Sequence, residues 1–389
     1  MGCVLIAPDK FKGTLTAPEV AAHVARGLAA AVPGVVTDEF PVADGGDGTV
    51  DAAVAAGYRR AGISVRGPAS EPVSAAFAIS GDVAVIESAQ ACGLSRLPGG
   101  HPLPLTATSH GVGELIAAAV DMGARRIVLG LGGVATTDGG AGLVRALGGR
   151  LLDAAGREIA PGGAALTALH HLDMTGMRDL SGVDVLLASD VDNPLLGPEG
   201  AAAVYGPQKG ASAADVAVLE EGLARWADIA EAALGQARSG DQVRTARFRD
   251  QAGAGAAGGL GFAALAFLNA RMRPGIEVML DLLSFGRRVA GASLVVTGEG
   301  ALDTQTLRGK APAGVARATT AASPGTPVVA VAGRCSLDAA LLTRAGIAAA
   351  YALTDIEPDV QSCMTNAGPL LEKLAQQIAG DWLPAARPA

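Results

Sequence analysis

The chain has few aromatic residues, and its charged residues form no basic run. Aromatics make up 3% of the 389 residues although hydrophobic residues make up 50%, and alanine and glycine fill the difference. A core of Ala, Val and Leu favours helices packed closely on a sheet, and the length suits about two or three domains. The net charge of −8 is diffuse, so we expect no nucleic-acid partner.

Cysteine is scarce, and neither cysteine nor histidine shows the spacing of a metal or redox site. The four cysteines lie far apart, which predicts reduced thiols in a cytoplasmic protein rather than disulfides. The five histidines show no zinc pattern, and the doublet His170-His171 predicts a surface turn.

Segments typical of secretion or of a membrane span are also lacking. The apolar start of the chain stops at Pro8-Asp9-Lys10 and has no basic beginning, so it is too short for a signal peptide. The uncharged stretch 252–270 is long enough to span a bilayer, but its first half is mostly glycine and alanine. It predicts a glycine-rich loop that leads into a buried helix. We therefore expect a cytoplasmic protein with no membrane partner.

No Walker P-loop is present, which removes the commonest ATP-binding scaffold. Gly309-Lys310 is followed by Ala311 instead of Ser or Thr, and Thr304 stands at the position of the first glycine. An ATP-dependent enzyme with this sequence needs another way to bind phosphates.

Two stretches satisfy the glycine pattern of dinucleotide-binding sites. Gly253-x-Gly255-x-x-Gly258 has no predicted strand before it. Gly130-x-Gly132-x-x-Ala135 follows a predicted strand, and Asp153 lies near the distance expected for the ribose-binding acid. Because such patterns arise by chance in a chain with 54 glycines, a nicotinamide-dependent hydroxy-acid dehydrogenase is kept only as an alternative.

Strand and helix signals alternate at both ends of the chain. Thr16 and Glu19 form the signature of a capping box, with a proline in the first turn of the helix that they open. Such alternation predicts a parallel sheet. The expected strands are 3–7, 35–42, 293–297, 327–332 and 347–353, and the expected helices are 17–32, 49–56, 313–322, 337–344 and 369–379.

The centre of the chain has a different pattern. Strand signals at 63–66, 73–80 and 83–87 follow one another with short turns, which predicts antiparallel pairing. We therefore predict an α/β protein in which an inserted α/β domain with a mixed sheet, residues 68–286, interrupts a Rossmann-like parallel-sheet domain. That outer domain would comprise residues 1–67 and 287–389. Later signals in the centre are helices at 111–122, 141–147 and 213–234 and strands at 126–131 and 183–188.

Glycine-rich loops with a nearby carboxylate or lysine occur from end to end of the chain. Glycine permits a positive φ and a close approach to a ligand, so that backbone N–H groups can point at anionic oxygens. An adjacent Asp can hold a metal or take a proton. The loops predict a phosphate-handling enzyme whose site is assembled from distant segments. They are residues 44–49, 130–133 followed by 138–140, 206–210, 253–255 and 297–300.

Three charged residues have two interpretations each. Asp190 follows the predicted strand 183–188, at the kind of strand end where α/β proteins bind ligands, but it can also belong to a plain turn. Lys12 lies in the first strand-to-helix turn, where a phosphate contact is plausible. Lys12 and Lys209 are each either phosphate contacts or solvated lysines.

Seven motifs occur in order along the chain, at residues 7–13, 43–49, 132–140, 190–195, 206–211, 253–259 and 298–300. Together they resemble the bacterial type I glycerate kinase family over essentially the whole chain. The resemblance implies an enzyme that phosphorylates D-glycerate with ATP and Mg²⁺, typically giving 2-phosphoglycerate. It also implies two α/β domains with the site in the cleft. The chain departs from the family pattern at Val134, Thr137 and Ser189, where the family often has Ser, Asn and Cys.

Within this resemblance each candidate receives a hypothetical role. Asp190 would orient and deprotonate the 2-hydroxyl, and Lys12 and Lys209 would neutralise charge on the transferring group. Phosphorylation at the 3-hydroxyl, a non-catalytic sensor of sugar acids and a homodimer all stay open. Candidates for binding phosphate or substrate are Gly45, Gly46, Gly132, Gly133, Gly139, Gly140 and Asn193. Candidates for holding Mg²⁺ through water are Asp44, Asp138, Glu299 and Asp303.

Overall fold

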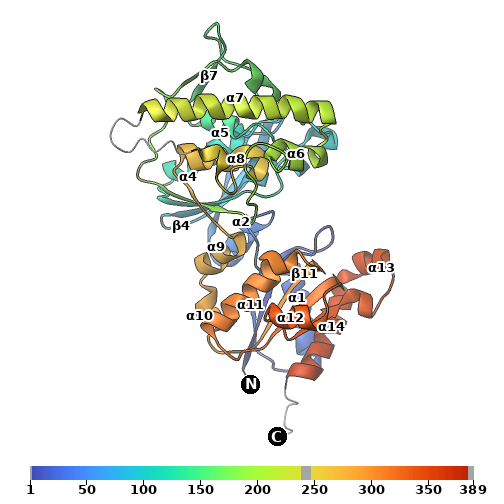
Figure 1. Cartoon of the computed structure of the whole chain (residues 1–389). Helices are drawn as coiled ribbons and strands as arrows, with labels where there is room; N and C mark the ends of the chain where they lie inside the picture. Colours follow the sequence, from blue (N-terminus) through green and yellow to red (C-terminus); the bar gives the residue numbers. More distant parts are fainter. Residues whose placement is uncertain (1, 238–246, 384–389) are drawn as a thin grey trace. The chain divides into compact units, whose positions relative to one another are not determined.

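The chain divides into two compact units, each with its own sheet and core. A computed structural model describes residues 2–237 and 247–383 (Figure 1). The first unit comprises Met1–Asp44, Asp51–Gly57 and Pro274–Ala389, and the second comprises Gly45–Val50 and Tyr58–Arg273. Within the described residues, no helix is long and apolar enough to cross a membrane.

The first unit is built on a parallel sheet. Its strands are β1 (Cys3–Pro8), β2 (Thr37–Glu39), β11 (Ala292–Leu302), β12 (Val328–Cys335) and β13 (Ala349–Ala352). Its helices include α1 (Ala17–Ala31), α9 (Gly275–Leu282), α10 (Phe285–Val289), α11 (Ala311–Ala322), α12 (Ala339–Arg344), α13 (Val360–Thr365) and α14 (Ala367–Trp382). The short helix α2 (Thr49–Ala55) begins in the second unit and ends in the first.

The order of the strands defines a switch point in this sheet. In the described part of the chain the order is β13-β12-β11-β1-β2, and all neighbours are parallel. The crossover from β1 to β2 and the crossover from β11 to β12 lead in opposite directions. Because such crossovers are right-handed, α1 and α11 lie on opposite faces of the sheet. Open α/β sheets bind ligands at such a point, beyond the carboxyl ends of the two strands.

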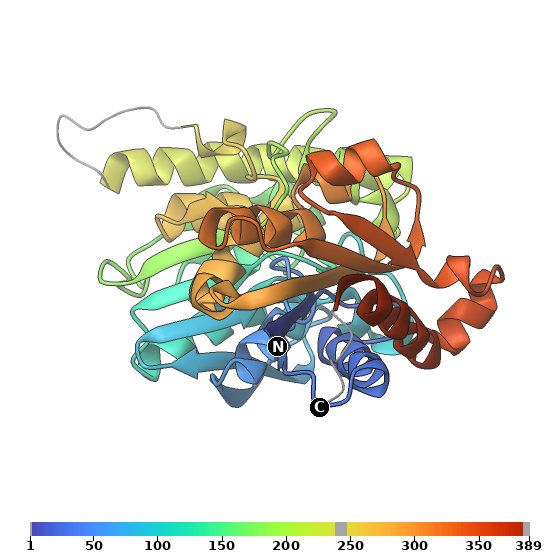
Figure 2. The same ribbon diagram turned by 90° about the horizontal axis from the view of Figure 1, so that it is seen from below.

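Local sequence signals set the start of α1 and its packing on α14. The Glu19 carboxylate accepts the N–H of Thr16 at 2.8 Å, and the Thr16 hydroxyl accepts the N–H of Glu19, so the predicted capping box is formed. Helices α1 and α14 lie side by side (Figure 1, Figure 2). A Cβ on Gly27 would meet the carbonyl oxygen of Glu372, so glycine allows the two helices to approach this closely.

The second unit has a mixed sheet, which confirms the predicted fold class. Its strands are β3 (Arg59–Arg66), β4 (Pro72–Ser80), β5 (Val83–Glu87), β6 (Arg126–Gly130), β9 (Asp184–Ala188) and β10 (Arg271–Arg273). Over the described residues β10, β9, β6 and β5 are parallel in that order, and β4 and β3 continue the sheet antiparallel. Its helices are α3 (Ser88–Cys92), α4 (His110–Asp121), α5 (Ala141–Ala146), α6 (Ala201–Tyr205), α7 (Ala213–Ala237) and α8 (Ala256–Phe267).

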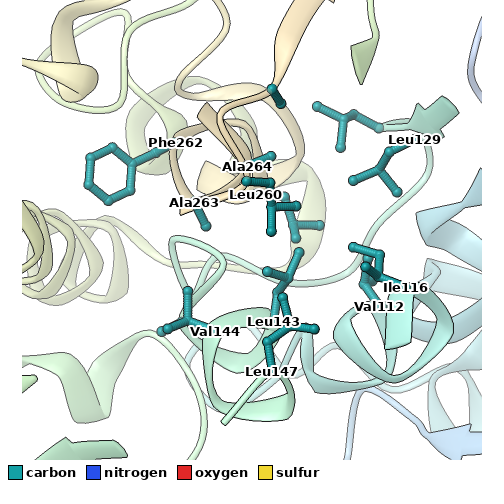
Figure 3. Packing of buried hydrophobic residues seen from close by; sticks show 14 of the residues in the cluster. Val112, Ile116, Leu129, Leu143, Val144, Leu147, Leu260, Phe262, Ala263 and Ala264 are labelled. Carbon is teal, nitrogen blue, oxygen red and sulfur yellow. The ribbon is translucent and has the colours of Figure 1, made fainter. Parts of the chain in front are cut away.

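Helices α5 and α8 pack together in the core of the second unit. Leu143 and Val144 of α5 face Leu260 and Ala263 of α8 (Figure 3). The uncharged stretch 252–270 thus forms a glycine-rich turn and a buried helix, as predicted. Trp226 of α7 is fully buried in the same cluster and packs edge-on against Phe262 of α8, so two of the few aromatic residues meet in a core made mostly of small and aliphatic side chains.

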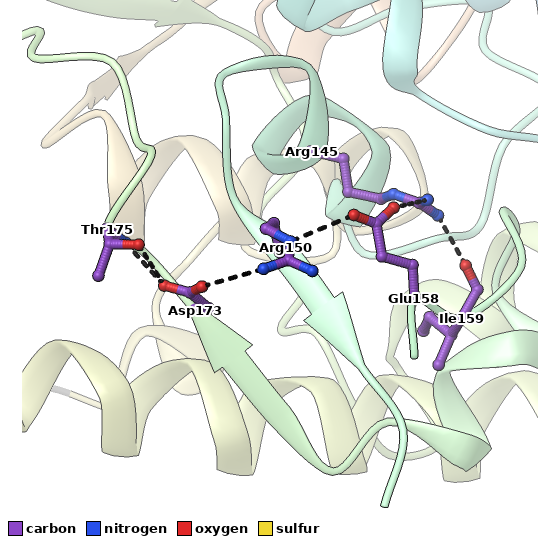
Figure 4. Close-up of polar contacts among 6 residues, drawn as sticks. All are labelled: Arg145, Arg150, Glu158, Ile159, Asp173 and Thr175. Carbon is purple, nitrogen blue, oxygen red and sulfur yellow. Dashed lines mark hydrogen bonds and ion pairs between the residues drawn. The ribbon is translucent and has the colours of Figure 1, made fainter. Parts of the chain in front are cut away.

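A small antiparallel sheet, β7 (Arg150–Leu152) and β8 (His171–Asp173), lies outside the sequence prediction. Arg150 lies between two carboxylates, with its Nε 3.3 Å from Glu158 and its Nη1 3.6 Å from Asp173 (Figure 4). His171 is exposed and begins β8, so the expected turn at the histidine doublet is instead the start of a strand.

Both joints between the units differ from the expected positions at 67/68 and 286/287. Strand β3 pairs with β4 along its whole length, so residues 59–66 belong to the sheet of the second unit. At the other joint, α9 and α10 pack against α11, so residues 274–286 belong to the first unit. Pairing and packing partners, rather than local propensity, decide to which unit a segment belongs.

Candidate functional site

Three carboxylates lie around the switch point of the first unit. Asp9 directly follows β1, and its N–H donates to the carbonyl of Gly298 in β11 at 2.8 Å. Glu299 is the next residue of β11, and Asp44 follows the segment that continues from β2. Asp9 and Glu299 are both 8% exposed. Buried acidic groups therefore lie at the carboxyl ends of β1 and β11, where a ligand would bind.

Several carboxylates lie close together at these strand ends. Burial, together with the charges of Asp44 and Glu299, raises the pKa of Asp9 to about 7, while Lys10 opposes the rise. Burial also raises the pKa of Glu299, against a hydrogen bond from the Thr306 hydroxyl at 2.5 Å. A bound cation would relieve this repulsion.

The remaining predicted residues of the first unit lie in loops near the same strand ends. Lys12 is exposed in the turn between β1 and α1. A Cβ on Gly300 would lie 3.4 Å from the backbone nitrogen of Lys12, so the backbone of this turn runs close to β11. Asp303 accepts the N–H of Gln305 at 2.8 Å, and its charge contributes to the raised pKa of Glu299. The structure therefore brings Lys12, Glu299 and Asp303 to one region, with Asp44.

In the second unit, four predicted glycines come together at the carboxyl end of β6. A Cβ on Gly132 would lie 2.5 Å from the Cα of Gly46, and one on Gly45 would meet the carbonyl of Ala188 at the end of β9. Gly133 has a positive φ of 70°, and a Cβ there would meet the Asp47 carboxylate. The loop 45–48 thus lies directly against the loop that follows β6.

Asp138 is buried within the second unit and accepts hydrogen bonds from its surroundings. Its Oδ2 accepts the N–H and the hydroxyl of Ser109 at 2.8 and 2.9 Å and the N–H of Gly142 at 3.2 Å, and its Oδ1 accepts the N–H of Gly140 at 3.1 Å. Burial raises the pKa of Asp138, and these hydrogen bonds lower it. The carboxylate therefore ties the start of α4 to the start of α5.

Gly139 and Gly140 are covered by the core rather than open to a ligand. A Cβ on Gly139 would lie 2.5 Å from the ring of Trp226, and one on Gly140 would meet Ala263. Their N–H groups donate to the Gly258 carbonyl and to Asp138. The glycines serve the turn and its packing, and both have a positive φ.

Lys209 is also buried, with 4% of its surface exposed. Its Nζ donates to the carbonyl of Thr136 at 2.6 Å. Burial lowers the pKa of Lys209 to about 8, while the neighbouring Cys92 and Asp138 oppose the shift. Lys209 therefore supports the loop 132–140 from inside the unit.

Asp190 and Asn193 follow β9 in the second unit, and only one of them is exposed. Asp190 is exposed at the surface. The Asn193 side chain donates to the carbonyl of Glu199 at 2.8 Å and accepts the hydroxyl of Tyr205 at 2.6 Å, so both ends of its amide hold the local loop. Asn193 therefore shapes the loop on whose surface Asp190 lies.

Comparison with known proteins agrees with this arrangement of motifs. A model described as "Glycerate kinase family" matches residues 4–383. The chain is 45% identical over 380 residues to the glycerate kinase of Bacillus subtilis (strain 168), covering 97% of this chain and 96% of that one. The chain belongs to the glycerate kinase family. The predicted membership, and with it the class of phosphotransferases, is confirmed.

Further relatives cover similar shares of both chains. The glycerate 2-kinase of Escherichia coli (strain K12) is 41% identical over 356 residues, which are 90% of each chain. A solved structure from Salmonella typhimurium LT2, assigned as glycerate kinase 2, has a TM-score of 0.82 and 40% identity and covers 98% of each chain. The α/β fold of the family thus extends over the whole described chain.

The residues at the switch point fit Mg²⁺ in a member of the glycerate kinase family. Within residues 2–237 and 247–383, no group of three or more His, Cys, Asp or Glu side chains is arranged to hold a metal ion together. Mg²⁺ usually binds one or two carboxylates, several waters and the phosphates of its nucleotide. The carboxylates of Asp44 and Glu299 match that mode, because burial raises the pKa of Glu299, the charges of Asp303 and Asp44 add to the rise, and a cation would offset their repulsion.

The dinucleotide-like glycine patterns have structural explanations in this glycerate kinase family member. Asp153 accepts the N–H groups of Ala155 and Arg157 at 2.8 and 2.9 Å, so it closes its own turn. In the described residues 247–252, a 3₁₀ turn rather than a strand precedes Gly253. A Cβ on Gly258 would meet the carbonyl of Thr136, so this glycine is needed for packing.

Two buried acids of the glycerate kinase fold were not among the predicted site residues. Asp9 directly follows the apolar strand β1, and Glu87 ends the fully buried strand β5. An acid at the end of an apolar strand is the signal that singled out Asp190, so the same rule applied to every strand would have found both.

Proposed function

We propose that the chain is an ATP- and Mg²⁺-dependent kinase that phosphorylates D-glycerate at the 2-hydroxyl to give 2-phosphoglycerate. The observation that carries the proposal is the match to glycerate kinases over nearly the whole chain, with one 41% identical relative named glycerate 2-kinase. The crowded carboxylates of the first unit support a partner that brings a divalent cation with its phosphates.

Charge neutralisation is the main requirement of phosphoryl transfer, and the first unit offers it in two forms. Mg²⁺, when bound with ATP, would neutralise phosphate charge beside Asp44 and Glu299. Asp303 would be a further acid near Glu299. Lys12, exposed in the turn after β1, would contribute a positive charge to the transferring group. The glycine loop 298–300 keeps the backbone close to that turn.

Acceptor activation is assigned to Asp190 of the second unit. Its carboxylate is exposed beyond the carboxyl end of β9, and it would accept the proton of the substrate hydroxyl. Gly45, Gly46, Gly132 and Gly133 would offer backbone N–H groups to phosphate or to the glycerate carboxylate.

Buried polar residues of the second unit receive supporting roles in this proposal. Asp138 and Gly140 are hydrogen-bonded to each other, Gly139 is packed under Trp226, and Lys209 holds the loop 132–140 through Thr136. Asp138 is therefore left out of the proposed Mg²⁺ ligands. Lys209 would influence the charge of the transferring group only through the loop 132–140, without touching that group.

Phosphorus NMR of a reaction with D-glycerate, ATP and Mg²⁺ tests the activity and the position together. The expected result is ADP with a single 2-phosphoglycerate signal. A 3-phosphoglycerate signal would correct the regiochemistry, and binding of glycerate without ADP formation would indicate a sensor. Stabilisation by NADH but not by ATP and Mg²⁺ would favour a dehydrogenase. A cytoplasmic location and a homodimer stay predictions.

A further inference from the structure

Glu87 joins a buried carboxylate to the backbone of the loop 45–50. Its Oε2 accepts the N–H of Gly48 at 3.1 Å and the N–H of Val50 at 3.3 Å. The side chain is 4% exposed, and all of these residues belong to the second unit. The loop is one of the glycine motifs that define the family resemblance, but Glu87 lies far from it in sequence.

The position of Glu87 in the sheet explains why it reaches this loop. Glu87 is paired with Gly130 of β6, and Gly130 is paired with Ala188 of β9, so the three residues form one row across neighbouring strands. A Cβ on Gly130 would meet the carbonyl of Gly45, and a Cβ on Gly45 would meet that of Ala188. The loop lies against this row, and Glu87 holds its far end.

The chemistry of the contact suits a firm attachment. The first N–H groups of a helix have no partner within the helix, and α2 begins at Thr49. A carboxylate that accepts such N–H groups forms charge-assisted hydrogen bonds, which are roughly twice as strong as neutral ones. Glu87, at the end of strand β5, therefore caps α2 and fixes the turn that contains Gly45 and Gly46.

We propose that Glu87 is a positioning residue of the kinase reaction, acting through the N–H groups of Gly48 and Val50. The inference rests on the proposed function, because the loop matters for catalysis only if Gly45 and Gly46 contact phosphate or glycerate. Glu87 itself touches neither substrate nor metal, and its charge takes no part in proton transfer.

Two substitutions separate positioning from direct chemistry. Glu87→Gln keeps an oxygen that can accept both N–H groups, so it should retain activity within about tenfold of wild type. Glu87→Ala removes the acceptor, and kcat/KM should fall by about 10²-fold, the effect expected of a displaced reacting group. An equal loss in both variants, with the loop amides of Glu87→Gln exchanging as in wild type, would overturn the proposal, because it would assign the role to the charge and not to the position of the loop. Asp173→Ala is the matched control, since Asp173, at the end of β8, accepts two hydrogen bonds from Thr175 and pairs with Arg150 (Figure 4).

Hydrogen–deuterium exchange supplies a readout that does not depend on activity. In Glu87→Ala the amides of residues 45–52 should exchange faster than in wild type, in Glu87→Gln they should exchange more slowly than in Glu87→Ala, and in Asp173→Ala they should match wild type. Unchanged exchange in Glu87→Ala would refute the attachment. If that variant does not fold, Glu87→Asp, whose reach is one methylene shorter, takes its place. A wild-type protein that forms no phosphoglycerate would instead remove the proposed function and, with it, the catalytic part of this inference.

Discussion

The two units surround their buried carboxylates with different partners. In the first unit, Asp9 and Glu299 have raised pKa values to which burial and neighbouring acids both contribute. In the second, Asp138 accepts three backbone N–H groups and a hydroxyl, and Glu87 accepts two backbone N–H groups. Both sets are at most 8% exposed, so the difference lies in the partners and not in the burial.

This contrast teaches how to separate functional from structural acids in one chain. A buried carboxylate surrounded by donors lowers the free energy of the fold, and removing it leaves those donors unpaired. A buried carboxylate beside other carboxylates raises that free energy unless a cation is bound. The first kind should affect stability when it is replaced, and the second kind should affect activity.

The largest effect is expected for the exposed acid that belongs to neither set. Asp190→Asn should lower kcat by about 10²- to 10⁴-fold, because a general base typically contributes that much, and thermal stability should stay unchanged. Asp184→Asn is the control, since Asp184 lies at the amino end of the same strand β9 and pairs with Arg271 on the surface. Steady-state kinetics checks both variants. A loss below about tenfold in Asp190→Asn would return Asp190 to a plain turn.

A large loss of stability should follow from Asp138→Ala. The substitution leaves three backbone N–H groups and the Ser109 hydroxyl without their acceptor, which should cost about 3 kcal/mol of unfolding free energy. Asp173→Ala, at the partly exposed end of β8, should cost less than about 1 kcal/mol. Urea unfolding measures both. Wild-type stability combined with a weaker response to Mg²⁺ would restore Asp138 to the metal ligands and break the contrast between the units.

Much of the fold could be predicted from the sequence because the signals are local. The capping box of Thr16 and Glu19 and the apolar strand β1 specify their elements without distant partners. The expected strand 35–42 is only Thr37–Glu39 in the structure, although the Phe40 and Val42 N–H groups still donate to carbonyls of β1. That strand lies at the edge of the sheet, where pairing on one side only gives a weak pattern.

The site could be predicted only in part, because residues far apart in sequence decide which loops are buried and which are open to a ligand. Gly139 and Gly140 have the composition of a phosphate loop, but Trp226 and Ala263 cover them from other helices. Lys209 reads as a solvated lysine or a phosphate contact, yet the fold buries it against Thr136. Composition identified the loops, and tertiary packing decides which of them face a ligand.

A smaller effect is expected when the crowding in the first unit is relieved. Asp44→Asn should lower the apparent affinity for Mg²⁺ by about 10- to 100-fold, as for groups that hold a metal through an outer shell. High Mg²⁺ should recover most of the rate, and stability should not fall, because a like charge beside Asp9 is removed. Asp38→Asn is the control, since Asp38 lies on β2 and pairs with Arg288. Initial rates across a Mg²⁺ titration measure the shift, and identical curves for Asp44→Asn and wild type would exclude Asp44.

The smallest effect concerns the pH dependence of stability in the second unit. The pKa of Lys209 falls from 10.5 to about 8 through burial. Between those values the unfolded chain binds more protons than the folded one, so this lysine makes stability rise with pH. From about pH 7 to pH 9 the gain is about 1 kcal/mol, and Lys209→Met should lack it.

Urea unfolding of wild type and Lys209→Met at several pH values measures this difference, since other titrating groups are common to both proteins. As the pH rises, the unfolding free energy of wild type should increase relative to that of Lys209→Met. Parallel curves would mean that the Lys209 ammonium keeps its water in the folded state. In that case the amine would be accessible to phosphate after all, and the second unit would carry charge to the reaction as the first unit does.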